Sequence, residues 1–149
     1  WSQGWHLPHL SRNEDNVSIV AIVDTCSHPK SSLNPNLESL SALSKRYGGN
    51  HKKNLHNNDC PVYSSVTELL NSNNNNLDGV MICTPHATHY QIAKELLDYN
   101  NNNNRHDDDN NDYNDNRPLH IFMEKPMTTN VHQAIRLHEL LSLSCETRK

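Results

Sequence analysis

The sequence predicts an α/β fold, in which a doubly wound parallel sheet carries helices on both faces. Three short, mostly apolar runs predict strands at 17–23, 79–83 and 119–123, and the first two are expected to be buried. Helical patterns alternate with these runs, which is typical of parallel sheets. The chain opens on a helical pattern, Trp5 to Leu10, so the first strand of the sheet is expected to be missing.

The helices between the strands have recognisable ends. Asn34 and Pro35 are typical of a helix start, and glycines at 48 and 49 predict its end. A short extended piece is expected at 61–63, just before the helix that begins at Ser65. The remaining starts are expected at the capping-box pair Ser65 and Glu68, at Ala87 and at Asn130.

Two asparagine-rich runs, 71–76 and 100–116, dilute the composition of what we expect to be one domain, 1–149. Only 34% of the 149 residues are hydrophobic, and these runs contain almost none of them. Each run lies between a helix and the next strand, so both are expected to be low-complexity loop insertions at the amino-terminal edge of the sheet. Asp107 to Asp109 could form a cation site, but a solvated loop is favoured, because nothing in the run supplies rigidity.

The charge balance and the cysteines exclude several classes of partner. Lys and Arg total 13 against 17 Asp and Glu, so no basic face is expected for nucleic acid. No apolar stretch approaches the roughly 20 residues that cross a bilayer, so no membrane partner is expected. The four cysteines are too far apart for zinc or redox motifs, which favours reduced thiols and a cytoplasmic protein.

Three polar motifs follow the predicted strands. They are Asp24, the segment 83–89 and the segment 124–126. Because ligands of open parallel sheets bind beyond the carboxyl ends of the strands, these motifs predict a ligand site at that edge.

The motifs together resemble the Gfo/Idh/MocA family, the glucose-fructose oxidoreductase and inositol dehydrogenase group. The resemblance rests on AIVD, VYSSVTELL, DGVMICTPHATH and MEKPM, at 21–24, 62–70, 78–89 and 123–127. It implies a Rossmann-like NAD(P)-binding domain, clipped at its amino terminus and lacking the carboxyl-terminal substrate domain. Ser2 would then stand at the third small position of the glycine-rich phosphate loop.

The resemblance implies that Asp24 binds the adenosine ribose, which favours NAD over NADP, because a 2′-phosphate would face a carboxylate. His28 and Lys30 lie close in sequence and could accommodate that phosphate, so NADP stays open. Alternatively, Asp24 is a strand-end residue that accepts hydrogen bonds from loop amides.

The segment after the second strand is implied to line the nicotinamide side of the cofactor through Thr84, Pro85, His86 and His89. His86 stands where the family often has asparagine. Thr84 and Pro85 could instead simply end the strand. A metal site at His86 and His89 is not expected, since no third ligand has compatible spacing.

Lys125 is the expected catalytic residue. The resemblance implies that it also contacts the cofactor, and that it orients the reacting hydroxyl and assists its proton transfer. Glu124 would line the cofactor pocket and Pro126 would shape the turn. The alternative is an exposed Glu–Lys pair before a turn.

The resemblance implies an NAD(P)-dependent oxidoreductase that moves hydride between nicotinamide and a hydroxyl-bearing carbon of a sugar, polyol or similar small molecule. The 149 residues alone are expected to be inactive, and any homo-oligomer would form through the second domain. One alternative is a non-catalytic dinucleotide-binding sensor or partner-binding module. Another is an unrelated flavodoxin-like domain, which would explain the alternation but not the paired motifs.

Overall fold

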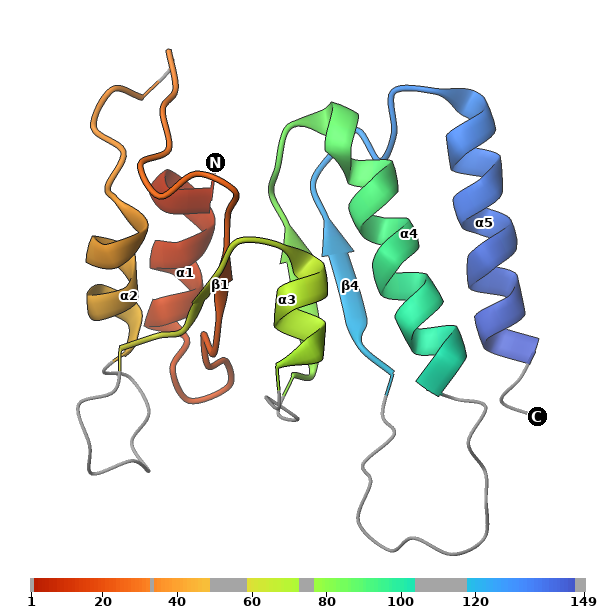
Figure 1. Cartoon of the computed structure of the whole chain (residues 1–149), viewed down its shortest axis with the longest axis horizontal. Coiled ribbons are helices and arrows are strands. Elements are labelled where there is room, and N and C mark those ends of the chain that lie inside the picture. The colour runs from red at the N-terminus through yellow and green to blue at the C-terminus, as the bar shows by residue number, and fades with distance from the viewer. Residues whose placement is uncertain (1, 33, 49–58, 73–76, 104–117, 147–149) are drawn as a thin grey trace, which may run out of the picture. The chain divides into compact units, whose positions relative to one another are not determined.

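The computed structural model describes residues 2–32, 34–48, 59–72, 77–103 and 118–146, which divide between two compact units (Figure 1). The units span 1–74 and 75–149. Each contains helices and one pair of parallel strands, which confirms the α/β class.

The first unit is built around a pair of two-residue strands. Strand β1 (Ile22–Val23) pairs in parallel with β2 (Val62–Tyr63), with Ile22 opposite Val62. The other elements of the unit are a π-helical turn (Ser2–His6), α1 (Leu7–Arg12), α2 (Leu40–Gly48) and α3 (Val66–Asn71).

The core of the first unit lies against one face of α2. Leu40, Leu43 and Tyr47 recur at helical spacing, so they share a face, and they pack with Cys60 in a buried cluster. Partly buried apolar side chains border this cluster: Leu7, Ile19 and Ile22.

The first predicted strand is shorter than expected. The run 17–23 is apolar except for Ser18, yet only Ile22 and Val23 form a ladder, and these two are half-buried. The Ile22 amide donates to the Pro61 carbonyl, and the Asp24 amide donates to the Tyr63 carbonyl. The partner β2 has two residues, and strand pairing extends only as far as the partner does.

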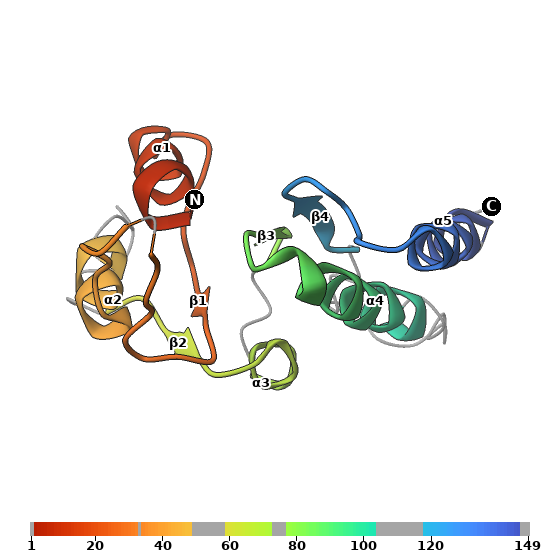
Figure 2. The ribbon, with the colours of Figure 1, turned by 90° about the horizontal axis from the view of Figure 1, so that it is seen from above.

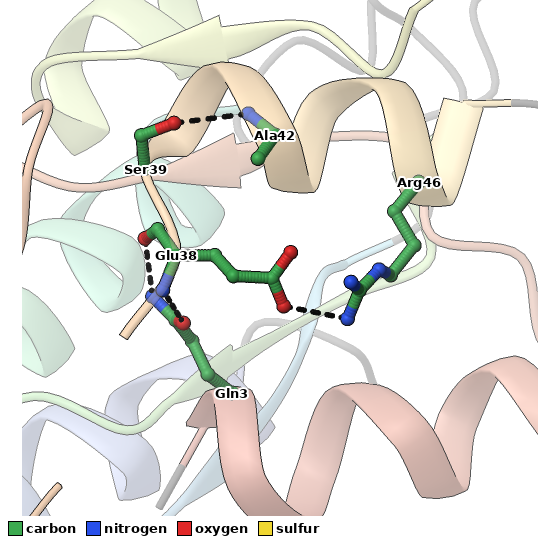
Figure 3. Close-up of polar contacts among 5 residues, drawn as sticks. All are labelled: Gln3, Glu38, Ser39, Ala42 and Arg46. Atoms are coloured by element: carbon green, nitrogen blue, oxygen red, sulfur yellow. Dashed lines mark hydrogen bonds and ion pairs between the residues drawn. The ribbon is translucent and has the colours of Figure 1, made fainter. Parts of the chain in front are cut away.

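The predicted start of α2 at Asn34 is wrong. The Asn34 carboxamide accepts from the Asn36 amide, which closes a local turn. The helix begins at Leu40, after Ser39, whose hydroxyl accepts from the Ala42 amide at 3.2 Å (Figure 3). Ser39 therefore caps the helix.

The segment before α2 is held by the side chain of Gln3. The Gln3 carboxamide accepts from the Glu38 amide at 2.8 Å and donates to the Glu38 carbonyl at 3.1 Å (Figure 3). The Glu38 carboxylate forms an ion pair with Arg46. The Gln3 side chain, in the π-helical turn, thus makes the pair of hydrogen bonds to the Glu38 backbone that a neighbouring strand would make in a sheet.

The expected cap of α3 is present, except that the Glu68 carboxylate bonds to Ser64. The Ser65 hydroxyl accepts from the Glu68 amide at 3.1 Å. The Glu68 carboxylate accepts from both the amide and the hydroxyl of Ser64. These hydrogen bonds stabilise the ionised carboxylate, with the Ser64 hydroxyl contributing most, and lower the pKa of Glu68.

The second unit has a longer pair of parallel strands. Strand β3 (Gly79–Ile82) pairs with β4 (His120–Met123), with Ile82 opposite Met123. Ile82 is buried, and Met123 on the same face is half-buried. Phe122 alternates to the other face, where its side chain is 58% exposed.

Helices α4 (His86–Asn103) and α5 (Val131–Glu146) run side by side in both views (Figures 1 and 2). Asn130 accepts from the His132 amide, which confirms the expected cap of α5. The buried apolar side chains of the two helices are Ala93, Leu96, Leu97, Leu137 and Leu140.

The second asparagine run starts within a helix. Residues 100–103 form the last turn of α4, and Asn100 is buried. Its carboxamide accepts from the Leu119 amide at 3.0 Å and donates to the Leu119 carbonyl at 3.1 Å. Residues 73–76 and 104–117, including Asp107 to Asp109, lie outside the described residues. None of the described helices is long and apolar enough to cross a membrane.

Candidate functional site

The exits of β3 and β4 lie next to each other at the carboxyl edge of the second unit's sheet. The parallel ladder continues one step beyond β4, where the Glu124 amide donates to the Ile82 carbonyl at 3.0 Å. Seven of the expected site residues follow these two strands: Thr84, Pro85, His86, His89, Glu124, Lys125 and Pro126. The fold therefore brings the TPHATH and EKP segments together.

The TPHATH segment turns from β3 into α4 through threonine hydroxyls. The Thr88 hydroxyl lies 2.8 Å from both the Thr84 hydroxyl and the Pro85 carbonyl, and the Thr88 amide also donates to that carbonyl. Thr84 is half-buried, whereas Pro85 and His86 are exposed. Sequence analysis did not single out Thr88, although a hydroxyl four residues after Thr84 on a first helical turn is a signal of this contact.

His89 is completely buried between the two segments. Its Nδ1 lies 2.9 Å from the Pro126 carbonyl, and its Nε2 lies 2.9 Å from the Thr84 carbonyl. The exposed His86 ring stands edge-on to it, with 5.5 Å between ring centroids. Both His89 nitrogens thus contact the backbone of the candidate site, which gives this side chain a structural role.

The EKP segment presents a lysine to solvent. The Lys125 side chain is exposed, and its backbone amide donates to the half-buried Glu124 carboxylate at 3.2 Å. The peptide bond between Lys125 and Pro126 is cis. A depression of about 340 Å³ follows this segment and is lined by Met127, Thr128, Thr129, Asn130, Val131 and Ala134.

Cys83, the first residue of the 83–89 segment, adds a thiol to this edge. Partial burial raises the pKa of the Cys83 thiol, and the negative charge of Glu124 raises it further. The thiol is therefore held in its neutral form beside Glu124. Within the described residues, no three His, Cys, Asp or Glu side chains are grouped to hold a metal ion.

Asp24 and Ser2 lie in the first unit. Asp24 follows β1, and its carboxylate accepts from the Cys26 amide at 2.9 Å, the loop contact named above as the alternative to ribose binding. Ser2 is half-buried in the π-helical turn.

Comparison with known families gives a match over residues 4–144. The matching family is GFO_IDH_MocA, described as an oxidoreductase family with an NAD-binding Rossmann fold. Comparison with curated proteins and with solved structures gives no match. The match spans nearly all of both units and includes Asp24, TPHATH and EKP.

Proposed function

Because the chain belongs to the Gfo/Idh/MocA oxidoreductase family, which has an NAD-binding Rossmann fold, we propose that it is the nucleotide-binding domain of an NAD(P)-dependent oxidoreductase. Its reaction moves hydride between nicotinamide and a hydroxyl-bearing carbon of a sugar, polyol or similar small molecule. The bound cofactor supplies the hydride chemistry, and the protein supplies binding, orientation and proton handling.

One observation carries the proposal: the TPHATH and EKP segments leave adjacent parallel strands at one edge. The Glu124 amide pairs with the Ile82 carbonyl, so the two segments start from adjacent points of one ladder. This edge is where dinucleotides bind in open parallel sheets. An alternation of helices and strands alone would not place these two motifs together.

The residues at this edge suit a nicotinamide cofactor. Pro85 and His86 are exposed and offer an apolar ring and an imidazole, while Thr84 is half-buried. Lys125 is exposed, so its ammonium can reach a ligand. Lys125 Nζ would hydrogen-bond to the substrate oxygen: as an ammonium it would give a proton to that oxygen when the carbonyl is reduced, and as a neutral amine it would take the proton when the hydroxyl is oxidised.

Asp24 would set the preference for NAD in the first unit. One of its oxygens accepts from the Cys26 amide, and the other can accept from a ribose hydroxyl. The hydrogen bond to Cys26 fixes the carboxylate in place. A 2′-phosphate would meet this negative charge, so NADH is expected to bind more tightly than NADPH.

The complete sheet of this domain is proposed to be doubly wound, with a first strand and glycine-rich turn upstream of residue 1. In support, β1 and β3 each pair with a single strand among those described, so each has an edge open to another strand. A substrate domain downstream would supply contacts to the small molecule and any homo-oligomer interface.

The test compares NADH and NADPH binding by the 149-residue chain and by a version that begins about 15 residues upstream, enough for a strand and a turn. The longer version is expected to bind NADH more tightly than the shorter one. In the longer version, Asp24→Ala should reduce the preference for NADH over NADPH by roughly tenfold, the loss of one hydrogen bond to a charged group.

Asp59→Ala is the matched control. Asp59 is exposed and precedes β2, so it lies at the amino-terminal edge of the same small sheet. Its loss should leave the NADH to NADPH ratio unchanged. Equal NADH affinity of the two versions, or an unchanged ratio in Asp24→Ala, would contradict the proposal.

A further inference from the structure

His89 combines complete burial with two hydrogen-bond partners that can only accept. The ring lies on the first turns of α4, with 0% of the residue exposed. Its two nitrogens each lie 2.9 Å from a backbone carbonyl, one on Thr84 and one on Pro126. These carbonyls belong to the two segments that form the candidate site.

The chemistry of imidazole decides what these contacts require. A carbonyl oxygen accepts and never donates, so each ring nitrogen must carry a hydrogen to bond to it. Neutral imidazole has one N–H, and only imidazolium has two. In the neutral ring, one nitrogen lone pair would face a carbonyl lone pair at 2.9 Å.

We propose that His89 is a positioning residue that, with a hydrogen on each ring nitrogen, ties the TPHATH segment to the EKP segment. The Pro126 carbonyl is adjacent to Lys125 in sequence, so the contact fixes the backbone that carries the Lys125 side chain. The inference rests on the proposed function only in naming Lys125 as the group being positioned.

Full burial opposes the positive charge of this state, and the two carbonyl oxygens in contact with the ring are the groups that offset it. His86 is exposed and turns its ring edge toward His89, and Lys125 is exposed to water. Glu124 supplies a negative charge at the exit of β4, next to the neutral Cys83 thiol. On the rest of α4 and on α5, Lys94 pairs with Asp98 and Arg136 pairs with Glu139. His132 and His138 on α5 are exposed.

Nitrogen NMR of the 149-residue chain, labelled in its histidine rings, tests the protonation directly. The His89 signals are identified by their loss in His89→Gln. Both His89 ring nitrogens should show an attached hydrogen that exchanges slowly with water. A bare nitrogen in the His89 ring would overturn the two-donor arrangement.

Amide hydrogen exchange tests the positioning. In His89→Leu the Lys125 and Met127 amides should exchange about tenfold faster, since the local opening of their segment becomes easier. His89→Gln retains one donor group and should fall between His89→Leu and the natural protein. His138→Gln removes an exposed imidazole from α5 and should change neither amide.

The buried face of α5 reports whether the variants remain folded. The Leu137 and Leu140 amides should keep their protection in both His89 variants. If the Lys125 and Met127 amides exchange as slowly in His89→Gln as in the natural protein, the positioning role is overturned. This holds even if His89→Leu unfolds. Neither experiment contains a cofactor, so a failure to bind NADH would refute the proposed function and leave these results standing.

Discussion

Asn100 shows how a single polar side chain can replace a strand partner. Its carboxamide makes two hydrogen bonds to the backbone of Leu119, the residue just before β4. Gln3 makes the same pair of bonds with Glu38 (Figure 3). Ser44 and Cys60 also exchange two bonds, one through the Ser44 hydroxyl and one between backbones. Side chains therefore hold the backbone on both sides of residues 49–58 and 104–117.

Asn100→Ala tests this role. The substitution leaves the amide and the carbonyl of Leu119 buried without their partner, which costs about 1–3 kcal/mol for each group. We expect urea denaturation to show a loss of about 2–6 kcal/mol in the free energy of unfolding, the sum over the two groups. Asn102→Ala, at an exposed position of the same helix turn, is the control. Equal effects of the two substitutions would show that the Asn100 contacts do not stabilise the unit.

The buried thiol of Cys60 is expected to make the free energy of unfolding fall at high pH. Burial raises the pKa of its thiol from 9.0 to about 11. Below pH 9 the thiol is neutral in both states, and the full stability is present. Between pH 9 and 11 the unfolded chain ionises first, so about 2–3 kcal/mol of stability is lost.

The measurement is the free energy of unfolding in urea at pH 8 and pH 11, for the natural protein and for Cys60→Ala. Tyrosines and lysines titrate over the same range, and the comparison cancels their contribution. The natural protein should lose more stability than Cys60→Ala between the two pH values. An identical loss would mean that the Cys60 thiol is not held neutral by burial.

At the scale of elements, the pairing of β3 with β4 depends on a glycine. A Cβ placed on Gly79 would lie 2.8 Å from the His120 carbonyl oxygen, closer than packed atoms tolerate. The oxygen belongs to the backbone of the neighbouring strand, so it cannot move aside without shifting β4. Only glycine permits this approach.

Gly79→Ala should lower the free energy of unfolding by about 1–3 kcal/mol, the usual range for an overpacked site. Gly4→Ala is the matched control, because no atom lies within 4 Å of its added Cβ. Gly4 is in a helical turn, where alanine is favoured over glycine by up to about 1 kcal/mol. In thermal unfolding, the melting temperature of Gly79→Ala should therefore be lower than that of the natural protein. The melting temperature of Gly4→Ala should be higher or unchanged. A Gly79→Ala protein as stable as Gly4→Ala would refute the close approach.

Sequence patterns predicted some elements well. The apolar runs at 79–83 and 119–123 differ from β3 and β4 by one residue each, and Ser65 and Asn130 are caps as expected. These features depend on local residues alone. The meeting of the two strand exits also followed from the sequence, because parallel pairing places carboxyl ends together.

Other features depend on partners that are distant in sequence. The run 17–23 has strand composition throughout, but its ladder ends where β2 ends. Asn34 has the right residue type for a cap, yet its carboxamide bonds within a turn, and Ser39 caps α2. His89 could be assigned to the site from its motif, but its two carbonyl partners arise only from the folded backbone.

For the molecule as a whole, one family match crosses both compact units. Residues 4–144 carry the pattern of an NAD-binding oxidoreductase domain, and the structure contributes the adjacency of TPHATH and EKP. The proposed function depends on binding of the nicotinamide end of the cofactor at the carboxyl edge of the β3–β4 pair. Lys125 is the exposed cation at that edge.

The most direct test is a titration of the nitrogen-labelled, upstream-extended protein with NADH, followed through its backbone amide signals. We expect saturable shifts at Cys83, Thr84 and residues 86–89, and at Glu124, Lys125 and Met127. His120, at the opposite end of β4, and Leu143, near the end of α5, should not shift. Saturable binding that leaves all of these amide signals unchanged, or the absence of binding, would refute nicotinamide binding at this edge.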